Sequence, residues 1–148
     1  LSKSSNLAGY RAGYAAGCSD LIGELLQARK HLGLIPPAPV QAAMIAALGD
    51  DDAVDAQRER YRARRVRLLA ALETAGFRID ESSAGLYLWA TRAEDAWATV
   101  SELAGHGILV TPGTFYGAAG ASHVRISLTA TDERIEAAAR RLEQLSNR

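Results

Sequence analysis

A long helical segment in the middle of this chain of 148 residues separates two stretches of different character. Three aspartates at positions 50–52 begin the segment, where the positive end of a helix dipole favours carboxylates. The helical pattern continues to about Ala75 and ends at Gly76. Loops and helices precede it, whereas strands and helices alternate after it. The sequence therefore predicts two domains, residues 1–52 and residues 53–148.

The first stretch is expected to be mainly helical. Residues 14–17 are apolar and predict a short buried strand, and leucines at helical spacing predict a helix over residues 19–33. The prolines within residues 34–39 favour an extended segment, because a proline disfavours helix in the residue before it. A second helix is expected at about residues 40–48, which are rich in alanine.

The second stretch mixes strands and helices, a pattern typical of an α+β unit. Near its end, apolar side chains alternate with Arg125 and Ser127, so these two residues should share the polar face of a strand. Strands are expected at residues 77–80, 86–90, 108–110 and 124–128, and helices at residues 93–105 and 131–145.

Charge and cysteine content exclude several classes of protein. Seventeen basic and seventeen acidic side chains give a net charge of zero, whereas a protein that binds nucleic acid or an anionic membrane usually has a basic surplus. No apolar run approaches the roughly 18–20 residues of a membrane span, and the single Cys18 cannot form an intrachain disulfide. The three histidines lack metal-ligand spacing, so no metal site is expected. A cytoplasmic protein fits this composition best.

Six arginines between residues 58 and 67 offer a second interpretation of the long helix. A cluster of this kind can bind nucleic acid, but helical spacing spreads these side chains around the cylinder. Asp51, Asp55 and Glu59 lie within reach for pairing about one turn away. A solvated helix between domains is therefore the favoured interpretation.

The residues with the clearest chemistry lie at the start of the chain. Lys3 stands in a loop rich in glycine and serine, and Arg11 follows eight residues later. A lysine amine can bond to an aldehyde, and an arginine fork can hold a phosphate at two points. Together with small residues that let a cofactor approach the backbone, these groups suit pyridoxal phosphate. A surface lysine and an ordinary salt-bridged arginine are the alternatives.

The run LSKSSNLAGYRAG at residues 1–13 resembles the lysine-attachment signature of the class I and II aminotransferases, which are fold-type I pyridoxal-phosphate enzymes. The resemblance implies that Lys3 joins the cofactor covalently and then acts as the catalytic base. It also implies that Arg11 binds the phosphate and that Ser2 adds a hydrogen bond nearby. In that family the lysine lies well past the middle of the polypeptide. The chain is therefore expected to be the C-terminal piece of a longer α/β enzyme, in which the large cofactor-binding domain ends at about residue 52 and a small α+β domain follows.

Arg125 is the third expected site residue. The stretch TPGTFYG at residues 111–117, followed by Gly120 and by HVRISL at residues 123–128, resembles a family segment whose arginine binds the substrate α-carboxylate. A planar guanidinium on the polar face of a strand can pair a carboxylate at two points. A surface salt bridge for the arginine and a simple turn for the glycine-rich run are the alternatives.

A further likeness concerns GLYLW at residues 85–89, which resembles a family strand that brings backbone close to the substrate. The proline that usually precedes this strand is Ser83 here, a departure that loosens the expected turn. Tyr87 and Trp89 are interpreted as core residues in preference to substrate contacts.

Over most of its length the chain is similar to the actinobacterial-type succinyldiaminopimelate transaminases of lysine biosynthesis, in runs such as RKHLGLIPPAPVQAAM and HVRISLTATDERI. This likeness implies amino transfer from glutamate to N-succinyl-2-amino-6-ketopimelate by a homodimer. The alternatives are an aminotransferase of another amino acid or a lyase with the same cofactor, and a non-catalytic piece with a structural or dimerising role. Because the groups that hold the cofactor's ring lie outside these residues, the chain alone is expected to bind the cofactor weakly and to be inactive.

Overall fold

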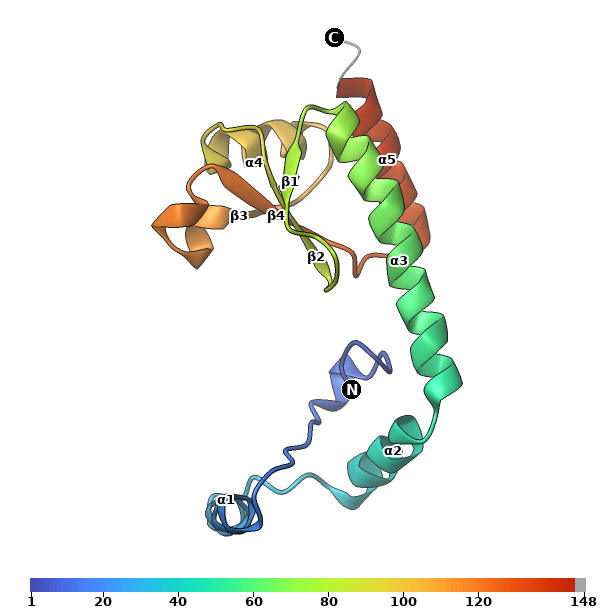
Figure 1. Cartoon of the computed structure of the whole chain (residues 1–148), viewed down its shortest axis with the longest axis vertical. Coiled ribbons are helices and arrows are strands. Elements are labelled where there is room, and N and C mark those ends of the chain that lie inside the picture. The colour runs from blue at the N-terminus through green and yellow to red at the C-terminus, as the bar shows by residue number, and fades with distance from the viewer. Residues whose placement is uncertain (146–148) are drawn as a thin grey trace. The chain divides into compact units, whose positions relative to one another are not determined.

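The computed structural model describes residues 1–145, which form two compact units (Figure 1). One unit ends at Glu59 and the other begins at Arg60. The division falls within α3 (Asp51–Thr74), which confirms the long helix expected from the sequence. The domain boundary at residue 52, and the assignment of the first part to a larger cofactor-binding domain, stay predictions.

The first unit consists of helices joined by loops. A turn of 3-10 helix at Ala8–Tyr10 precedes α1 (Ser19–His31) and α2 (Ala38–Leu48), so both expected helices are confirmed. The expected strand at residues 14–17 is wrong, because this segment has no regular structure and Tyr14 is exposed. An apolar run forms a strand only where a neighbour supplies hydrogen-bond partners. None of the described residues of this unit forms such a strand.

The second unit contains a four-stranded antiparallel sheet in the order β1-β2-β4-β3. The strands are β1 (Arg78–Asp80), β2 (Tyr87–Thr91), β3 (Thr111–Pro112) and β4 (His123–Ser127). Antiparallel sheets commonly bury one face and leave the other open. In β4, Val124 and Ile126 are buried while Arg125 is only half-buried, which confirms the alternation expected from the sequence.

The helix α4 (Ala96–Gly105) begins at residue 96 rather than at the expected residue 93. The Asp95 carboxylate accepts hydrogen bonds from the backbone N–H groups of Trp97 and Ala98, both at 3.0 Å. A carboxylate in this position satisfies N–H groups that have no partner inside the helix, and so sets its first residue.

The strand expected at residues 108–110 is also displaced along the chain. The residues that pair with β4 are Thr111 and Pro112, opposite Arg125 and Val124. Ile108 is buried and packs in the core without joining the sheet. The apolar run therefore marked a core contact and not a strand.

Three helices cover one face of the sheet: the second half of α3, then α4, and α5 (Asp132–Leu145). Within this unit α3 and α5 run side by side (Figure 1). Burial of one large apolar side chain stabilises a fold by roughly 1.5–3 kcal/mol relative to exposure. The largest fully buried side chains are Leu68, Leu72, Leu88, Leu103, Val124, Leu128 and Leu142.

Arginines of α3 bind other parts of the second unit. The buried Arg65 side chain donates hydrogen bonds to the backbone carbonyls of Ser82 and Gly85, and so holds the loop between β1 and β2. Arg64 pairs with Asp132 of α5, with Nε and Oδ1 2.6 Å apart. The interpretation of a solvated helix is therefore wrong for these two arginines. Both side chains are largely enclosed and bind groups of the second unit that lie far away in the sequence.

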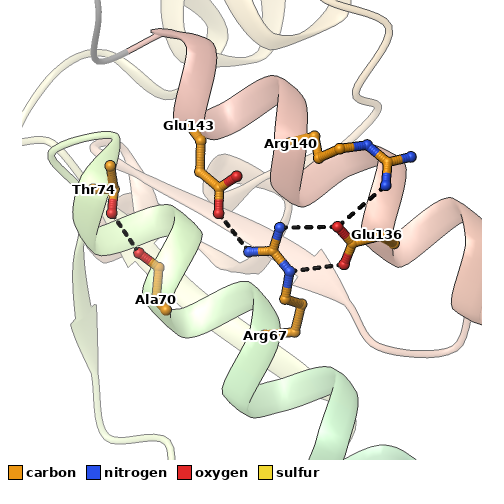
Figure 2. Close-up of polar contacts among 6 residues, drawn as sticks. All are labelled: Arg67, Ala70, Thr74, Glu136, Arg140 and Glu143. Carbon is orange, nitrogen blue, oxygen red and sulfur yellow. Dashed lines mark hydrogen bonds and ion pairs between the residues drawn. The ribbon is translucent and has the colours of Figure 1, made fainter.

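Arg67 binds two carboxylates of α5 (Figure 2). Its guanidinium contacts both oxygens of Glu136, at 2.7 and 3.0 Å, and one oxygen of Glu143 at 2.5 Å. Arg140, one turn along α5, contacts the same Glu136 at 3.2 Å. The hydrogen bonds from Arg67, with smaller contributions from the charges of Arg67 and Arg140, hold the pKa of Glu136 below its ordinary value.

The Arg67 contacts should make the stability of the chain depend on pH. A carboxylate whose pKa is lowered by folding stabilises the folded state above its unfolded pKa, and this contribution is lost as the pH falls through the folded pKa. Arg67→Met should therefore lower the midpoint of urea unfolding at pH 7. The difference from the unchanged chain should shrink as the pH falls below about 4.

Arg140→Met is the matched control, because it removes a single, more exposed contact to the same glutamate. Its urea midpoint at pH 7 should fall less than that of Arg67→Met, since exposed pairs contribute little. Equal losses in the two variants, or a loss from Arg67→Met that is as large in acid as at pH 7, would contradict this account.

Candidate functional site

A row of four side chains crosses the face of the sheet that the helices leave open. The strand register places Asp80 opposite Trp89, Trp89 opposite Arg125, and Arg125 opposite Thr111. Tyr87 lies two residues before Trp89, so its side chain leaves β2 on the same side. The sheet therefore surrounds Arg125, the expected substrate ligand, with aromatic neighbours.

The Arg125 guanidinium contacts two tyrosine rings. Its central carbon is 4.2 Å from the centre of the Tyr87 ring and 5.3 Å from that of Tyr116, both within the range of cation–π attraction. One terminal nitrogen contacts the Thr111 hydroxyl at 3.4 Å. Nε is buried without a hydrogen-bond partner, and no carboxylate among residues 1–145 pairs with this arginine. A guanidinium without an acidic partner has N–H groups available to donate hydrogen bonds to the carboxylate of a ligand.

A hydrogen-bonded pair supports the rings beside Arg125. The His123 ring stacks on Trp89, with centroids 5.2 Å and planes 10° apart, and its Nε2 lies 2.9 Å from Oδ2 of Asp80. The hydrogen bond with His123 is the largest cause that lowers the pKa of the Asp80 carboxyl. Trp89 in turn meets Tyr116 edge to face, with centroids 5.6 Å apart. A continuous chain of contacts therefore runs from Asp80 to one of the rings on Arg125.

Close contact between two glycines positions Tyr116. A Cβ atom added to Gly113 would overlap the Gly120 carbonyl oxygen, and one added to Gly120 would overlap the carbonyl group of Gly113. Two short 3-10 turns, Gly113–Tyr116 and Ala118–Gly120, carry the chain between these contacts. The glycine-rich run is therefore more than a simple turn, because it closes the loop that carries Tyr116.

The lysine and the arginine expected to hold the cofactor lie in the first unit. Hydrogen bonds from the backbone N–H groups of Ser5 and Leu7 to the Leu1 carbonyl, at 3.1 and 3.4 Å, close the loop that carries Lys3. The Lys3 side chain is exposed. Arg11 follows the first 3-10 turn with a φ of 50°, in the left-handed region that few residues other than glycine adopt.

The chemistry of these groups fits pyridoxal phosphate. The Arg11 guanidinium makes one hydrogen bond, from Nη1 to the Ala8 carbonyl at 3.1 Å, and pairs with no carboxylate among residues 1–145. It therefore has donors available for a phosphate. It also lines a cavity of about 550 Å³ within the first unit. Lys3 offers an amine and Ser2 a hydroxyl on the neighbouring loop, so the donor set matches an aldehyde and a phosphate.

The described residues offer little to other kinds of site. Within residues 1–145, no three histidine, cysteine or acidic side chains gather as ligands for a metal ion. In the same range, no helix has both the length and the apolar character needed to cross a membrane. The only cysteine, Cys18, is a free and exposed thiol.

The fold and these two groups of residues lead to one family. Residues 1–142 match the family model for aminotransferase class I and II, and the chain belongs to that family. Its solved neighbours have the fold-type I architecture, and the chain matches the C-terminal part of that fold. Members of the family generally depend on pyridoxal phosphate.

Two relatives are similar along most of the chain. The 4-dedimethylamino-4-oxo-anhydrotetracycline transaminase of Streptomyces rimosus is 63% identical over 142 residues, which make up 96% of this chain and 40% of that protein. A probable aminotransferase of Mycobacterium tuberculosis is 61% identical over 142 residues, which make up 96% of this chain and 34% of that protein. The chain thus spans 40% or less of the length of these relatives.

Solved structures agree with this placement. An aminotransferase from Staphylococcus aureus superposes with a TM-score of 0.85 at 32% identity, over 99% of this chain and 40% of the other. The N-succinyldiaminopimelate aminotransferase from Mycobacterium tuberculosis superposes with a TM-score of 0.83 at 29% identity, over 97% of this chain and 40% of the other. Both likenesses cover nearly the whole of this chain.

The structure places Ser2, Lys3 and Arg11 in the first unit and Arg125 in the second. The roles assigned to these four residues stay predictions. The surface salt bridge considered for Arg125 is not formed within residues 1–145. Tyr87 is not a core residue, because its side chain is 41% exposed and lies beside Arg125.

Several members of the arginine site were not identified from the sequence. The alternation that turns Arg125 outward also turns Tyr87 and Trp89 outward once β2 pairs with β4, so these two could have been found by aligning the strands. Tyr116 and His123 lie in the two runs that resemble the family segment, but strand alternation could not place their side chains relative to Arg125. Tyr116 comes from a loop, and His123 acts through a contact with a residue of a strand that is not adjacent to its own.

The contact between Gly113 and Gly120 predicts that a side chain at either position destabilises the loop. Gly113→Ala should destabilise the second unit by about 1–3 kcal/mol or more, because the new methyl group would collide with backbone atoms that cannot move freely. Urea unfolding of the chain measures this loss. Gly105→Ala is the matched control, since nothing lies within 4 Å of the added methyl group and alanine is the better helix former, so this variant should lose no stability. Similar stabilities for the two variants would exclude the proposed packing.

Proposed function

We propose that this chain is the C-terminal part of a pyridoxal-phosphate-dependent aminotransferase. The observation that carries the proposal is the Arg125 guanidinium, which has no carboxylate partner within residues 1–145 and contacts two tyrosine rings on the open face of the sheet. The segment with Lys3 and Arg11, and the family to which residues 1–142 belong, support the same activity.

Arg125 is proposed to bind the α-carboxylate of the amino acid substrate. Because Nε is enclosed, an incoming carboxylate would meet the terminal nitrogens of the fork. The two rings give the guanidinium a partly apolar surrounding, and a charged hydrogen bond is stronger where the surroundings are less polar. This contact would hold the substrate by the group that every amino acid shares.

Lys3 and Arg11 are proposed to hold the cofactor and to carry the proton. When bound, pyridoxal phosphate supplies the electron sink that allows an amino group to move between two carbon skeletons. The Lys3 amine would hold the cofactor through its aldehyde group, and Lys3 Nζ would serve as the base that moves the proton at the substrate α-carbon. Arg11 would bind two phosphate oxygens through its fork, and the Ser2 hydroxyl would donate a further hydrogen bond.

The proposed amino transfer runs between glutamate and N-succinyl-2-amino-6-ketopimelate. The resemblance of the whole chain to succinyldiaminopimelate transaminases supports this acceptor, as does the structural likeness to the M. tuberculosis N-succinyldiaminopimelate aminotransferase. LL-diaminopimelate aminotransferases of several bacteria are also relatives, at 37–39% identity. These proteins share a pimelate skeleton in the substrates that their names give.

A ring ketone is the second candidate acceptor. The observation that favours it is the 63% identity with the 4-dedimethylamino-4-oxo-anhydrotetracycline transaminase, compared with 29% for the solved N-succinyldiaminopimelate enzyme. Both candidates keep the same cofactor chemistry and differ only in the molecule that receives the amino group.

The complete protein is proposed to be a cytoplasmic homodimer that acts on small molecules. Family members typically form dimers and use small-molecule substrates. The equal numbers of basic and acidic side chains, 17 of each, give this chain no general attraction to nucleic acid or to an anionic membrane.

Attachment of the cofactor to Lys3 tests the proposed class of enzyme. The complete protein should show a visible absorbance band with pyridoxal phosphate, and borohydride should fix the cofactor's mass on the peptide that contains Lys3. Lys3→Ala should abolish that label and lower kcat by at least about 100-fold, the usual scale for loss of a catalytic base. Lys30→Ala is a control that removes an exposed lysine of α1 and should leave the label on the Lys3 peptide and kcat unchanged. A Lys3→Ala enzyme with full activity would overturn the proposal.

Competition between acceptors tests the substrate. With glutamate as donor, the complete protein should convert N-succinyl-2-amino-6-ketopimelate with a higher kcat/KM than 4-dedimethylamino-4-oxo-anhydrotetracycline. The reverse order would establish the second candidate. If Lys3 carries the label but neither acceptor is converted, the class of enzyme stands and both acceptors are excluded.

A further inference from the structure

The Arg125 guanidinium has few polar contacts to hold it. Among the described residues its one side-chain hydrogen bond, to the Thr111 hydroxyl, is long at 3.4 Å, and its Nε has no partner there. An arginine side chain has many rotamers, so a site that binds a carboxylate in one geometry must restrict them by other means. The two tyrosine rings, which contact the guanidinium directly, can do so.

We propose that Tyr87 and Tyr116 are positioning residues, which fix the direction in which Arg125 presents its terminal nitrogens to the substrate carboxylate. The inference rests on the proposed function, because it takes Arg125 as the carboxylate ligand. It adds two residues that act on the substrate through that arginine.

Aromatic rings can orient a guanidinium without neutralising it. A carboxylate neighbour would hold Arg125 more strongly, but it would also occupy the donors that the substrate needs. The faces of the Tyr87 and Tyr116 rings attract the cation and leave its full charge available. This explains why an arginine on the open face of the sheet has ring neighbours and no acidic partner within residues 1–145.

The position of Tyr116 is itself restricted by its contact with Trp89 and by the closure of its loop. Its ring meets Trp89 edge to face, and Trp89 is stacked on His123, which is bound to Asp80. The loop that carries Tyr116 is closed by the contact between Gly113 and Gly120. These contacts therefore restrict the Tyr116 ring, although the residue is 54% exposed.

Phe115 provides an internal contrast. It is adjacent to Tyr116 and even more exposed, but its ring packs against Trp97, with centroids 5.8 Å apart. Among residues 1–145 the cation–π contacts of Arg125 are with Tyr87 and Tyr116, and not with Phe115. A change at Phe115 removes an aromatic ring from the same loop without removing one from the arginine. It is therefore the matched control for Tyr116.

The test uses the complete, cofactor-loaded enzyme with leucine at either tyrosine. Tyr87→Leu and Tyr116→Leu should each raise the KM for glutamate about fivefold to tenfold, the scale expected for loss of one partly desolvated cation–π contact. In each variant kcat should change less than about twofold, because the rings act on binding. Tyr→Phe at either position keeps the ring and should restore the KM, whereas Phe115→Leu should leave it unchanged.

A second measurement follows the arginine directly. Phenylglyoxal modifies accessible arginines, and mass spectrometry of the peptide containing Arg125 gives the rate. That rate should rise several-fold in Tyr87→Leu and Tyr116→Leu, because the rings no longer cover the guanidinium. Arg140, which is 60% exposed on α5, serves as the reference and should react equally in all variants. Tyr→Met is a second ringless variant of similar size, in case a leucine variant does not fold.

The outcomes separate this inference from the proposed function. If Arg125→Lys leaves the KM for glutamate unchanged, Arg125 is not the carboxylate ligand and both proposals fail. If Arg125→Lys raises the KM but the ringless variants behave like Phe115→Leu, the proposed function stands and the positioning role is overturned. Phenylalanine variants that are as impaired as the leucine variants would also overturn it, because the effect would then belong to the hydroxyl groups.

Discussion

The pairing of β2 with β4 is the interaction on which the rest of the second unit depends. Its register places Trp89 opposite Arg125 and, one step along, Ala90 opposite Val124. A slip by one residue would turn every side chain of a strand to the other face, which would bury Arg125 and expose Val124. The apolar side chains that pack under α3, α4 and α5 prevent such a slip. Hydrophobic burial on one face of the sheet therefore determines which polar and aromatic side chains meet on the other.

Much of this arrangement could be predicted from the sequence because it follows local rules. Strand alternation identified the outward direction of Arg125, and helical spacing with terminal glycines identified the helices. The ends of helices and strands, and strands inferred from isolated apolar runs, were predicted less reliably. The apolar residues 14–17 did not form a strand, and the strand expected at 108–110 lies at 111–112, because pairing depends on a neighbour that local sequence does not reveal.

The surroundings of individual side chains could not be predicted, since they depend on residues far away in the sequence. Arg58 and Arg65 belong to the same run of arginines, but Arg58 pairs with Asp55 at the surface while Arg65 is buried and holds the β1–β2 loop. The surroundings of the candidate site also depend on residues far away in the sequence. Arg125 was identifiable as a single residue, but its two rings come from β2 and from a loop, and only the folded chain brings them together.

The contact between Gly113 and Gly120 affects how this domain can change during evolution. Because the backbones of the two glycines touch, a side chain at either position would push apart the ends of the loop between them. Phe115 and Tyr116 lie in this loop against Trp97 and Trp89, so an inserted or deleted residue would displace both rings. The length of the loop should therefore vary less than the identity of its other side chains.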